Sequence, residues 1–195
     1  KYNIVWLARE SWRAGMATPE IMPTVNAFAA DAVNFTRNYS GGNGTRQGVF
    51  TMFYGLYGNY WDPFLKSRRG PLFIDWLKED GYDFSCITSA KFSYPEFDKT
   101  VFSAVPTAAL YSYDQDLTWM RDRLNVTRLV DFLKSPARKD KPFFAFMFFE
   151  SPHAPYEFPP DAEIRKDYMS KLDYTRLRRA EDGPKIFNRY VNANN

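Results

Sequence analysis

The sequence predicts an α/β fold in which a mostly parallel sheet is flanked by helices on both faces. Short apolar runs of strand length alternate along the chain with segments of helical spacing, and this alternation is typical of a parallel sheet. With 195 residues, 45% of them hydrophobic, the chain can bury a substantial core. Its single cysteine, Cys86, cannot form an internal disulfide, so the core does not depend on one. We therefore expect one domain, or most of one.

The N-terminal part of the chain contains two predicted strands and two predicted helices. Residues 2–8 are a short apolar run, which we interpret as a strand covered on both faces. Residues 23–32 show helical spacing and begin with a proline, which suits the first turn of a helix. Residues 34–39 alternate and are rich in strand-forming side chains, so they predict a second strand. Residues 45–54 follow a glycine-rich turn and predict a helix.

The rest of the chain repeats this alternation. Residues 71–80 predict a helix and residues 82–88 a strand. A long helix is expected over residues 116–134, and the aromatic run 143–149 is the clearest strand signal. From residue 156 onward the chain becomes proline-rich and then highly charged, which we interpret as a solvated helix rather than a binding patch.

Two polar segments follow predicted strands and are expected at one edge of the sheet. Glu10 ends the first strand, and Ser151-Pro152-His153 follows the last. In parallel α/β sheets, ligands bind outside the carboxyl ends of the strands. Glu10 is therefore a candidate oxygen ligand for a divalent cation, although it could also be the first solvated residue after the strand. His153, the only histidine, could donate to a substrate oxygen or protonate a leaving group, or it could be structural.

The turn Ser40-Gly41-Gly42-Asn43-Gly44 leads into the helix that begins at Thr45. The unpaired N–H groups at a helix N-terminus favour a phosphate or sulfate oxygen. The Thr45 hydroxyl could then act as a nucleophile beside a metal, or it could simply cap the helix. Arg46 and Asn43 are candidate substrate contacts, and Arg46 could equally be a surface residue.

Residues 3–11, 34–55 and 149–156 resemble the alkaline phosphatase superfamily, specifically the sulfatase-like branch that contains lipoteichoic acid synthases and phosphoethanolamine transferases. The segment 34–55 is especially similar to the periplasmic domains of enterobacterial inner-membrane proteins that regulate lipopolysaccharide synthesis. The resemblance covers essentially the whole chain. It implies an alkaline phosphatase-like fold, with residues 1–195 as an incomplete, N-terminal portion of one sulfatase-like α/β domain.

The resemblance also implies roles for the candidate residues. Glu10 and Thr45 would bind a divalent metal ion (Mn, Mg or Zn), Thr45 would be the nucleophile, and His153 would contact the substrate phosphate. Family members complete the metal site with an Asp-His pair and a further histidine, whereas this chain has only His153. Part of the ligand set is therefore expected outside this chain, and this fragment alone is expected to be inactive.

The leading expectation is a metal-dependent phospho-group transferase or hydrolase that acts on a phosphodiester, such as a lipid headgroup of the cell envelope. The resemblance places it in the periplasm or on the outer face of the bacterial cytoplasmic membrane, with a membrane anchor outside this chain. One alternative is a non-catalytic regulator that binds lipid or a membrane protein. Another is a sulfate-ester hydrolase, which is disfavoured because Cys86 lacks the Cys-x-Pro-x-Arg motif of sulfatases.

Two further classes find no support in the sequence. The net charge is only +3, and basic and acidic residues are interspersed, so no basic face for nucleic acid is expected. No stretch reaches the roughly 18 consecutive apolar residues that a membrane-spanning helix needs.

Overall fold

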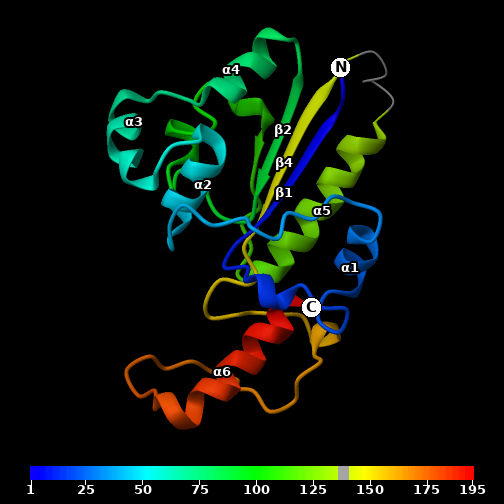
Figure 1. Ribbon diagram of the computed structural model, residues 1–195, viewed down its shortest axis with the longest axis vertical. Coiled ribbons are helices and arrows are strands. Elements are labelled where there is room, and N and C mark those ends of the chain that lie inside the picture. The colour runs from blue at the N-terminus through cyan, green and yellow to red at the C-terminus, as the bar shows by residue number, and fades with distance from the viewer. Residues whose placement is uncertain (136–140) are drawn as a thin grey trace.

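The computed structural model describes residues 1–135 and 141–195, and its centre is a four-stranded sheet with the order β1-β4-β2-β3 (Figure 1). The strands are β1 (Ile4–Arg9), β2 (Asp83–Thr88), β3 (Leu110–Tyr111) and β4 (Phe143–Phe149). All of their pairings are parallel. The predicted α/β class with a mostly parallel sheet is therefore confirmed.

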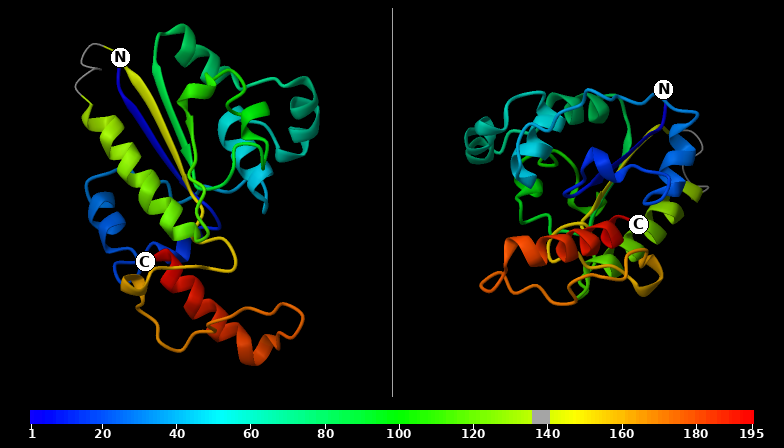
Figure 2. Two further views of the ribbon diagram at one scale, coloured as in Figure 1. Left: turned by 180° about the vertical axis from the view of Figure 1, so that it is seen from behind. Right: turned by 60° about the horizontal axis from the view of Figure 1, so that its bottom comes forward.

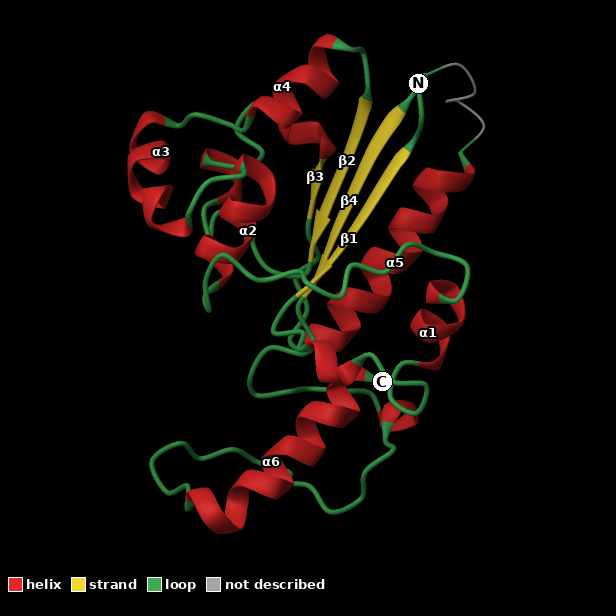
Figure 3. Ribbon diagram, viewed as in Figure 1, coloured by secondary structure: helices red, strands yellow, loops and turns green. Residues whose placement is uncertain are grey.

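Helices cover both faces of this sheet (Figures 2 and 3). One face carries α2 (Thr45–Tyr54), α3 (Trp61–Ser67) and α4 (Leu72–Glu79), and the other carries α5 (Thr118–Lys134). The short α1 (Pro23–Ala29) lies beside α5 and buries none of its residues, and α6 (Arg179–Asn194) lies beyond the carboxyl ends of the strands. No helix of the two described ranges is both long and apolar enough to cross a membrane.

Strand β4 is central because every position from Phe144 to Phe148 is apolar and can be buried on both faces of the sheet. Its alternate phenylalanines join the cluster under α2 and α4, which contains Phe50 and Phe53. Ala145 and Met147 point the other way and pack with Leu129 of α5. The phenylalanines of this strand are core residues, as expected from their apolar run.

Two expectations about β-structure are wrong. Strand β1 is not covered on both faces, because Val5 and Leu7 are 46% and 56% exposed, while Trp6 stacks on Phe53 with ring centroids 4.7 Å apart. Within the described chain β1 pairs only with β4, so it is an edge strand. Residues 34–39 form no strand and run over the surface, since their alternating pattern finds neither a partner strand nor a core to cover.

Candidate functional site

Strand β1 places Glu10 at the carboxyl edge of the sheet. The parallel pairing of β1 with β4 runs to Arg9 opposite Phe149, and the Glu10 amide then donates a 2.9 Å hydrogen bond to the Phe149 carbonyl. One carboxylate oxygen of Glu10 accepts hydrogen bonds from the amide and hydroxyl of Ser11, at 3.0 and 3.1 Å. These contacts leave the other oxygen, Oε2, directed at a different partner.

That partner is Thr45, whose Oγ1 donates to Glu10 Oε2 at 2.8 Å across 35 residues of sequence. Thr45 is the first residue of α2, and the N-cap position belongs to Gly44, so no side chain caps the helix. The simple capping interpretation of Thr45 is therefore wrong. The hydroxyl instead faces the carboxylate at the end of β1, beside backbone N–H groups that have no partner within the helix.

The glycines of the turn allow it to fold closely onto α2. A Cβ atom added to Gly41 would lie 1.9 Å from Thr51 Oγ1, and one added to Gly42 would lie 2.5 Å from Gln47 Cβ. Small residues are thus required here by contact with α2 itself. Asn43 is exposed in this turn, and its side chain makes no hydrogen bond within the part of the chain that the structure describes.

Arg46 points to a carboxylate that the sequence did not reveal. Its guanidinium forms a bidentate ion pair with Glu96, with nitrogen-to-oxygen distances of 2.7 and 2.8 Å, and lies 4.8 Å from the Tyr94 ring centre. The hydrogen bond to Glu96 raises the pKa of Arg46, which keeps it charged. Arg46 borders Thr45, but an incoming anion would have to share it with Glu96.

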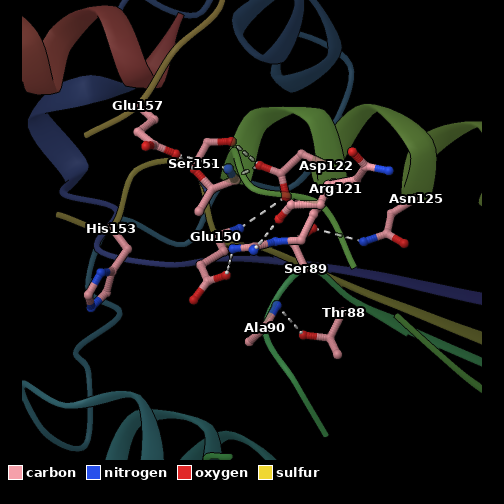
Figure 4. A network of polar contacts seen from close by, with 12 residues as sticks. Thr88, Ser89, Ala90, Arg121, Asp122, Asn125, Glu150, Ser151, His153 and Glu157 are labelled. Carbon is pink, nitrogen blue, oxygen red and sulfur yellow. Dashed lines mark hydrogen bonds and ion pairs between the residues drawn. The ribbon is translucent and has the colours of Figure 1, made fainter. Parts of the chain in front are cut away.

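His153 lies in the loop after β4, on the same edge of the sheet as Glu10, which agrees with the expected placement. Its amide donates to the Glu150 carbonyl at 2.8 Å, its ring is exposed, and Nδ1 lies 2.7 Å from the Ala154 carbonyl oxygen. The structure gives it no hydrogen bond to Glu10 or Thr45. Figure 4 shows the His153 ring turned away from the polar network described next.

A buried carboxylate on α5 holds the His153 loop (Figure 4). Asp122, 8% exposed, accepts hydrogen bonds from the amides of Glu150 and Ser151 at 3.1 and 3.0 Å, and also from the Ser151 hydroxyl. The neighbouring Arg121 forms a 2.9 Å ion pair with Glu150. Burial raises the pKa of the Glu150 carboxyl, and the charge of Arg121 opposes that shift.

The same helix also holds the end of β2, because Asn125 donates a 2.8 Å hydrogen bond to the Ser89 hydroxyl. The loops after β2 and β4 are thus both fixed to α5. Sequence reasoning missed these positioning residues, since a helical pattern does not show which polar side chain turns inward. A carboxylate on an otherwise amphipathic helix carries no such signal by itself.

The oxygens of Glu10 and Thr45 are hard ligands of the kind that divalent cations prefer. These two side chains could supply two ligands of a metal ion. Within the described ranges, no three histidine, cysteine or acidic side chains come close enough together to hold a metal ion. Cys86 is fully buried inside β2, where burial raises the pKa of its thiol, so it is not available as a reacting group.

Comparison with known sequences shows which family the chain belongs to. A sequence model of the family described as Sulfatase matches residues 2–194. The chain belongs to the sulfatase family. This confirms the resemblance to the sulfatase-like branch of the alkaline phosphatase superfamily, whose members carry out phosphoryl or sulfuryl transfer and generally use divalent metal ions.

Two curated relatives of this sulfatase-family chain come from bacteria. The inner membrane protein YejM of Salmonella typhimurium is 29% identical over 130 residues, which are 66% of this chain and 21% of that protein. An uncharacterized protein of Haemophilus influenzae is 26% identical over 147 residues, 75% of this chain and 24% of that protein. The matched parts of the chain thus span less than a quarter of the length of these relatives.

The fold is also found in a solved structure. A protein of the alkaline phosphatase superfamily from Vibrio parahaemolyticus matches the whole chain with a TM-score of 0.64 and 19% identity. The match covers 48% of that protein. The likeness shows the shared fold, and the sulfatase-family chain corresponds to about half of the neighbour.

Proposed function

We propose that this sulfatase-family chain carries the nucleophile of a phospho-group transferase or hydrolase that acts on a phosphodiester, such as a lipid headgroup. The observation that carries this proposal is the 2.8 Å hydrogen bond from Thr45 Oγ1 to Glu10 Oε2, at the uncapped N-terminus of α2. A hydroxyl, a carboxylate and free helix amides in one place are suited to a reacting phosphate.

The proposed reaction uses these groups in order. Thr45 Oγ1 forms a bond to phosphorus, its proton leaves along the hydrogen bond to Glu10, and the bond from phosphorus to the leaving alcohol breaks. The amides at the start of α2 stabilise the charge on the phosphoryl oxygens. His153 protonates the leaving oxygen or orients the substrate, and Arg46 and Asn43 contact it. Water or an acceptor alcohol then releases the phospho group from Thr45.

The metal requirement is part of the proposal. A divalent ion (Mn, Mg or Zn) held by Glu10 and Thr45 would lower the pKa of the hydroxyl and neutralise negative charge. The remaining ligands would come from outside residues 1–195, which we propose to be the N-terminal portion of one sulfatase-like α/β domain. We further propose an extracytoplasmic location and a membrane anchor outside this chain, supported by the relative named as an inner membrane protein.

Headgroup transfer from a fluorescent phospholipid in vesicles tests this proposal on the full-length protein, with added Mn²⁺, Mg²⁺ or Zn²⁺. Thr45→Ala is expected to lower the rate by at least about 10³-fold, the usual scale for loss of a nucleophile. The exposed Thr107→Ala is the matched control and should retain the rate. Transfer at the wild-type rate in Thr45→Ala would exclude Thr45 as the nucleophile.

A second candidate is a non-catalytic regulator that retains the fold and binds lipid or a membrane protein. Two observations favour it. Within the described residues only Glu10 and Thr45 are candidate metal ligands, and Arg46 is already paired with Glu96 rather than free to bind an anion. The same assay separates the two functions, because a regulator shows no transfer with any of the three metals.

A further inference from the structure

A groove lies where the segment after Glu10 meets helix α6. Its volume is about 380 Å³, and its lining includes Ser11, Arg13, Tyr156, Ile186, Phe187 and Tyr190. That volume lies within the range of small-molecule sites in proteins. The proposed reaction at Thr45 does not use this groove, so its chemistry needs a separate explanation.

The groove adjoins the candidate site through two loops. Ser11 lines it and also donates two hydrogen bonds to Glu10. Tyr156 lines it from the His153 loop, and its amide donates a 2.8 Å hydrogen bond to the His153 carbonyl. Tyr190 of α6 closes the far side, with its hydroxyl 2.6 Å from the Ser11 carbonyl that accepts its hydrogen bond. A molecule in this groove would therefore contact Ser11, the residue that follows Glu10 and is hydrogen-bonded to its carboxylate.

The wall of the groove is aromatic and partly uncovered. The rings of Tyr156 and Tyr190 meet edge to face, with ring centroids 5.4 Å apart, and the ring centroid of Phe187 lies 6.2 Å from that of Tyr190. Phe187 is 44% exposed, so part of its ring borders the groove without a covering side chain. Such a surface gains stability when an apolar group covers it.

The charge of the groove is unbalanced. Among the lining residues that the structure describes, Arg13 alone carries a charge, and its side chain is exposed. Within the part of the chain that the structure describes, Arg13 forms no ion pair, whereas Arg46 and Arg121 each have a carboxylate partner. A guanidinium that has no carboxylate partner and lies beside an aromatic wall is complementary to a molecule that has both an anionic and an apolar part.

The backbone on both sides of the groove is strained. Four non-glycine residues of the described chain have positive φ, and two of them, Ser11 (52°) and Tyr156 (60°), line this groove. The left-handed conformation is unfavourable for residues with a side chain, and it persists where surrounding structure holds it. These two positions lie one residue after Glu10 and three residues after His153, where the chain turns along the groove.

We propose that this groove binds an anionic amphiphile, with its alkyl chain against Phe187 and Tyr190 and its anionic group on Arg13. This anionic group is distinct from the phospho group that reacts at Thr45. The role of the groove as a subsite beside the reacting group rests on the proposed function. Binding of the amphiphile in the groove does not depend on any turnover at Thr45.

Calorimetric titration of the full-length protein tests the assignment, with each amphiphile kept below its critical micelle concentration. The probes are dodecyl phosphate, neutral dodecyl glucoside and inorganic phosphate. Arg13→Gln is expected to weaken dodecyl phosphate about tenfold and to leave dodecyl glucoside unchanged. Phe187→Ala is expected to weaken both amphiphiles about fivefold to tenfold, because it removes apolar contact from either chain.

The matched controls are Arg176→Gln, an exposed arginine outside the groove, and Trp76→Ala, an exposed aromatic residue on α4. Both should bind dodecyl phosphate like the wild type, and the urea midpoint of each variant shows that it is folded. Equal losses in the controls, or wild-type binding in Arg13→Gln and Phe187→Ala, would overturn the proposal.

Thr45→Ala separates the two proposals. If it abolishes headgroup transfer and leaves amphiphile binding unchanged, both stand. If transfer persists while binding depends on Arg13 and Phe187, the proposed function fails and the groove assignment stands. If Thr45→Ala removes amphiphile binding, the alkyl phosphate occupies the reacting site and the groove assignment is wrong.

Discussion

Replacing Asp122 by alanine is expected to destabilise the chain strongly, because one buried carboxylate accepts three hydrogen bonds that hold the loop after β4. Hydrogen bonds to charged groups contribute about 1.5–3 kcal/mol each. The sum overstates the loss, since the carboxylate is no longer desolvated and the freed amides can reach water. We therefore expect Asp122→Ala to lower the free energy of unfolding by about 3 kcal/mol.

Urea unfolding measures this loss, followed by tryptophan fluorescence. With an m-value of about 2 kcal/mol per molar, the midpoint should fall by about 1.5 M while the slope stays unchanged. Asp131→Ala is the control, since Asp131 is exposed on the same helix, and its effect should stay within about 0.5 kcal/mol. Ser151→Ala should add little to Asp122→Ala, because the two side chains share one contact. A loss below about 1 kcal/mol, or additive effects of the two substitutions, would refute this account of the loop.

Three further predictions follow from single contacts. Burial raises the pKa of the Glu150 carboxyl above its usual 4.5, so the folded state binds this proton more tightly than the unfolded state, and the contribution of Glu150 to stability falls as the pH rises through that folded pKa. Unfolding free energies measured from about pH 4 to 7 should therefore fall with pH more steeply for the wild type than for Glu150→Gln. Glu96→Gln should lower the free energy of unfolding by about 1 kcal/mol, because its ion pair with Arg46 is partly exposed, and should tighten phosphate binding measured by calorimetry. Gly41→Ala should cost about 1–3 kcal/mol in thermal unfolding, since its new Cβ overlaps Thr51.

Each of these has a matched control and a contrary outcome. For Glu96, the control is Asp161→Asn, whose ion pair with Arg123 is well exposed and should contribute less than about 0.5 kcal/mol. For Gly41, it is Gly15→Ala, where an added Cβ meets nothing within 4 Å. Equal losses in Glu96→Gln and Asp161→Asn would contradict the argument from ion-pair exposure, and equal losses in Gly41→Ala and Gly15→Ala would contradict the packing argument. Parallel pH curves for the wild type and Glu150→Gln would show that the carboxyl titrates normally in the folded chain.

The sequence predicted those elements whose signal is local. Strand β4 was predicted with its observed bounds, because a short, unbroken run of apolar residues is typical of a central parallel strand that is buried on both faces. Helix α2 was likewise predicted from Thr45 to Tyr54, with a glycine turn before it. The strand predicted at residues 34–39 was wrong, because an alternating pattern forms a half-buried strand only where a neighbouring strand and a core are present.

The candidate site was predictable only where topology alone determines proximity. Glu10 and His153 each follow a parallel strand, so the order of elements predicted that both lie at the carboxyl edge of the sheet. The pairing of Glu10 with Thr45 was implied by the family resemblance instead, because the strand predicted at residues 34–39, which would have led into Thr45, is absent. The contacts of Arg46 with Glu96 and of Glu150 with Asp122 were not predicted, because the partners lie 50 and 28 residues apart in the sequence and no periodicity shows which polar side chains meet.

The contacts of Glu10 show how the site stays organised. Its two oxygens together accept hydrogen bonds from the Ser11 amide and hydroxyl and from Thr45, and its own amide is tied to β4. A carboxylate with this many donors is held in one orientation by the protein alone, so the position of Thr45 is set before any other group arrives. Substituting Glu10 by glutamine would keep the shape and the acceptor for Ser11, but the amide would donate to Thr45 Oγ1 instead of accepting its proton. If Glu10→Gln loses headgroup transfer and keeps the wild-type urea midpoint, Glu10 acts in the reaction. If its urea midpoint falls together with transfer, Glu10 acts in the fold.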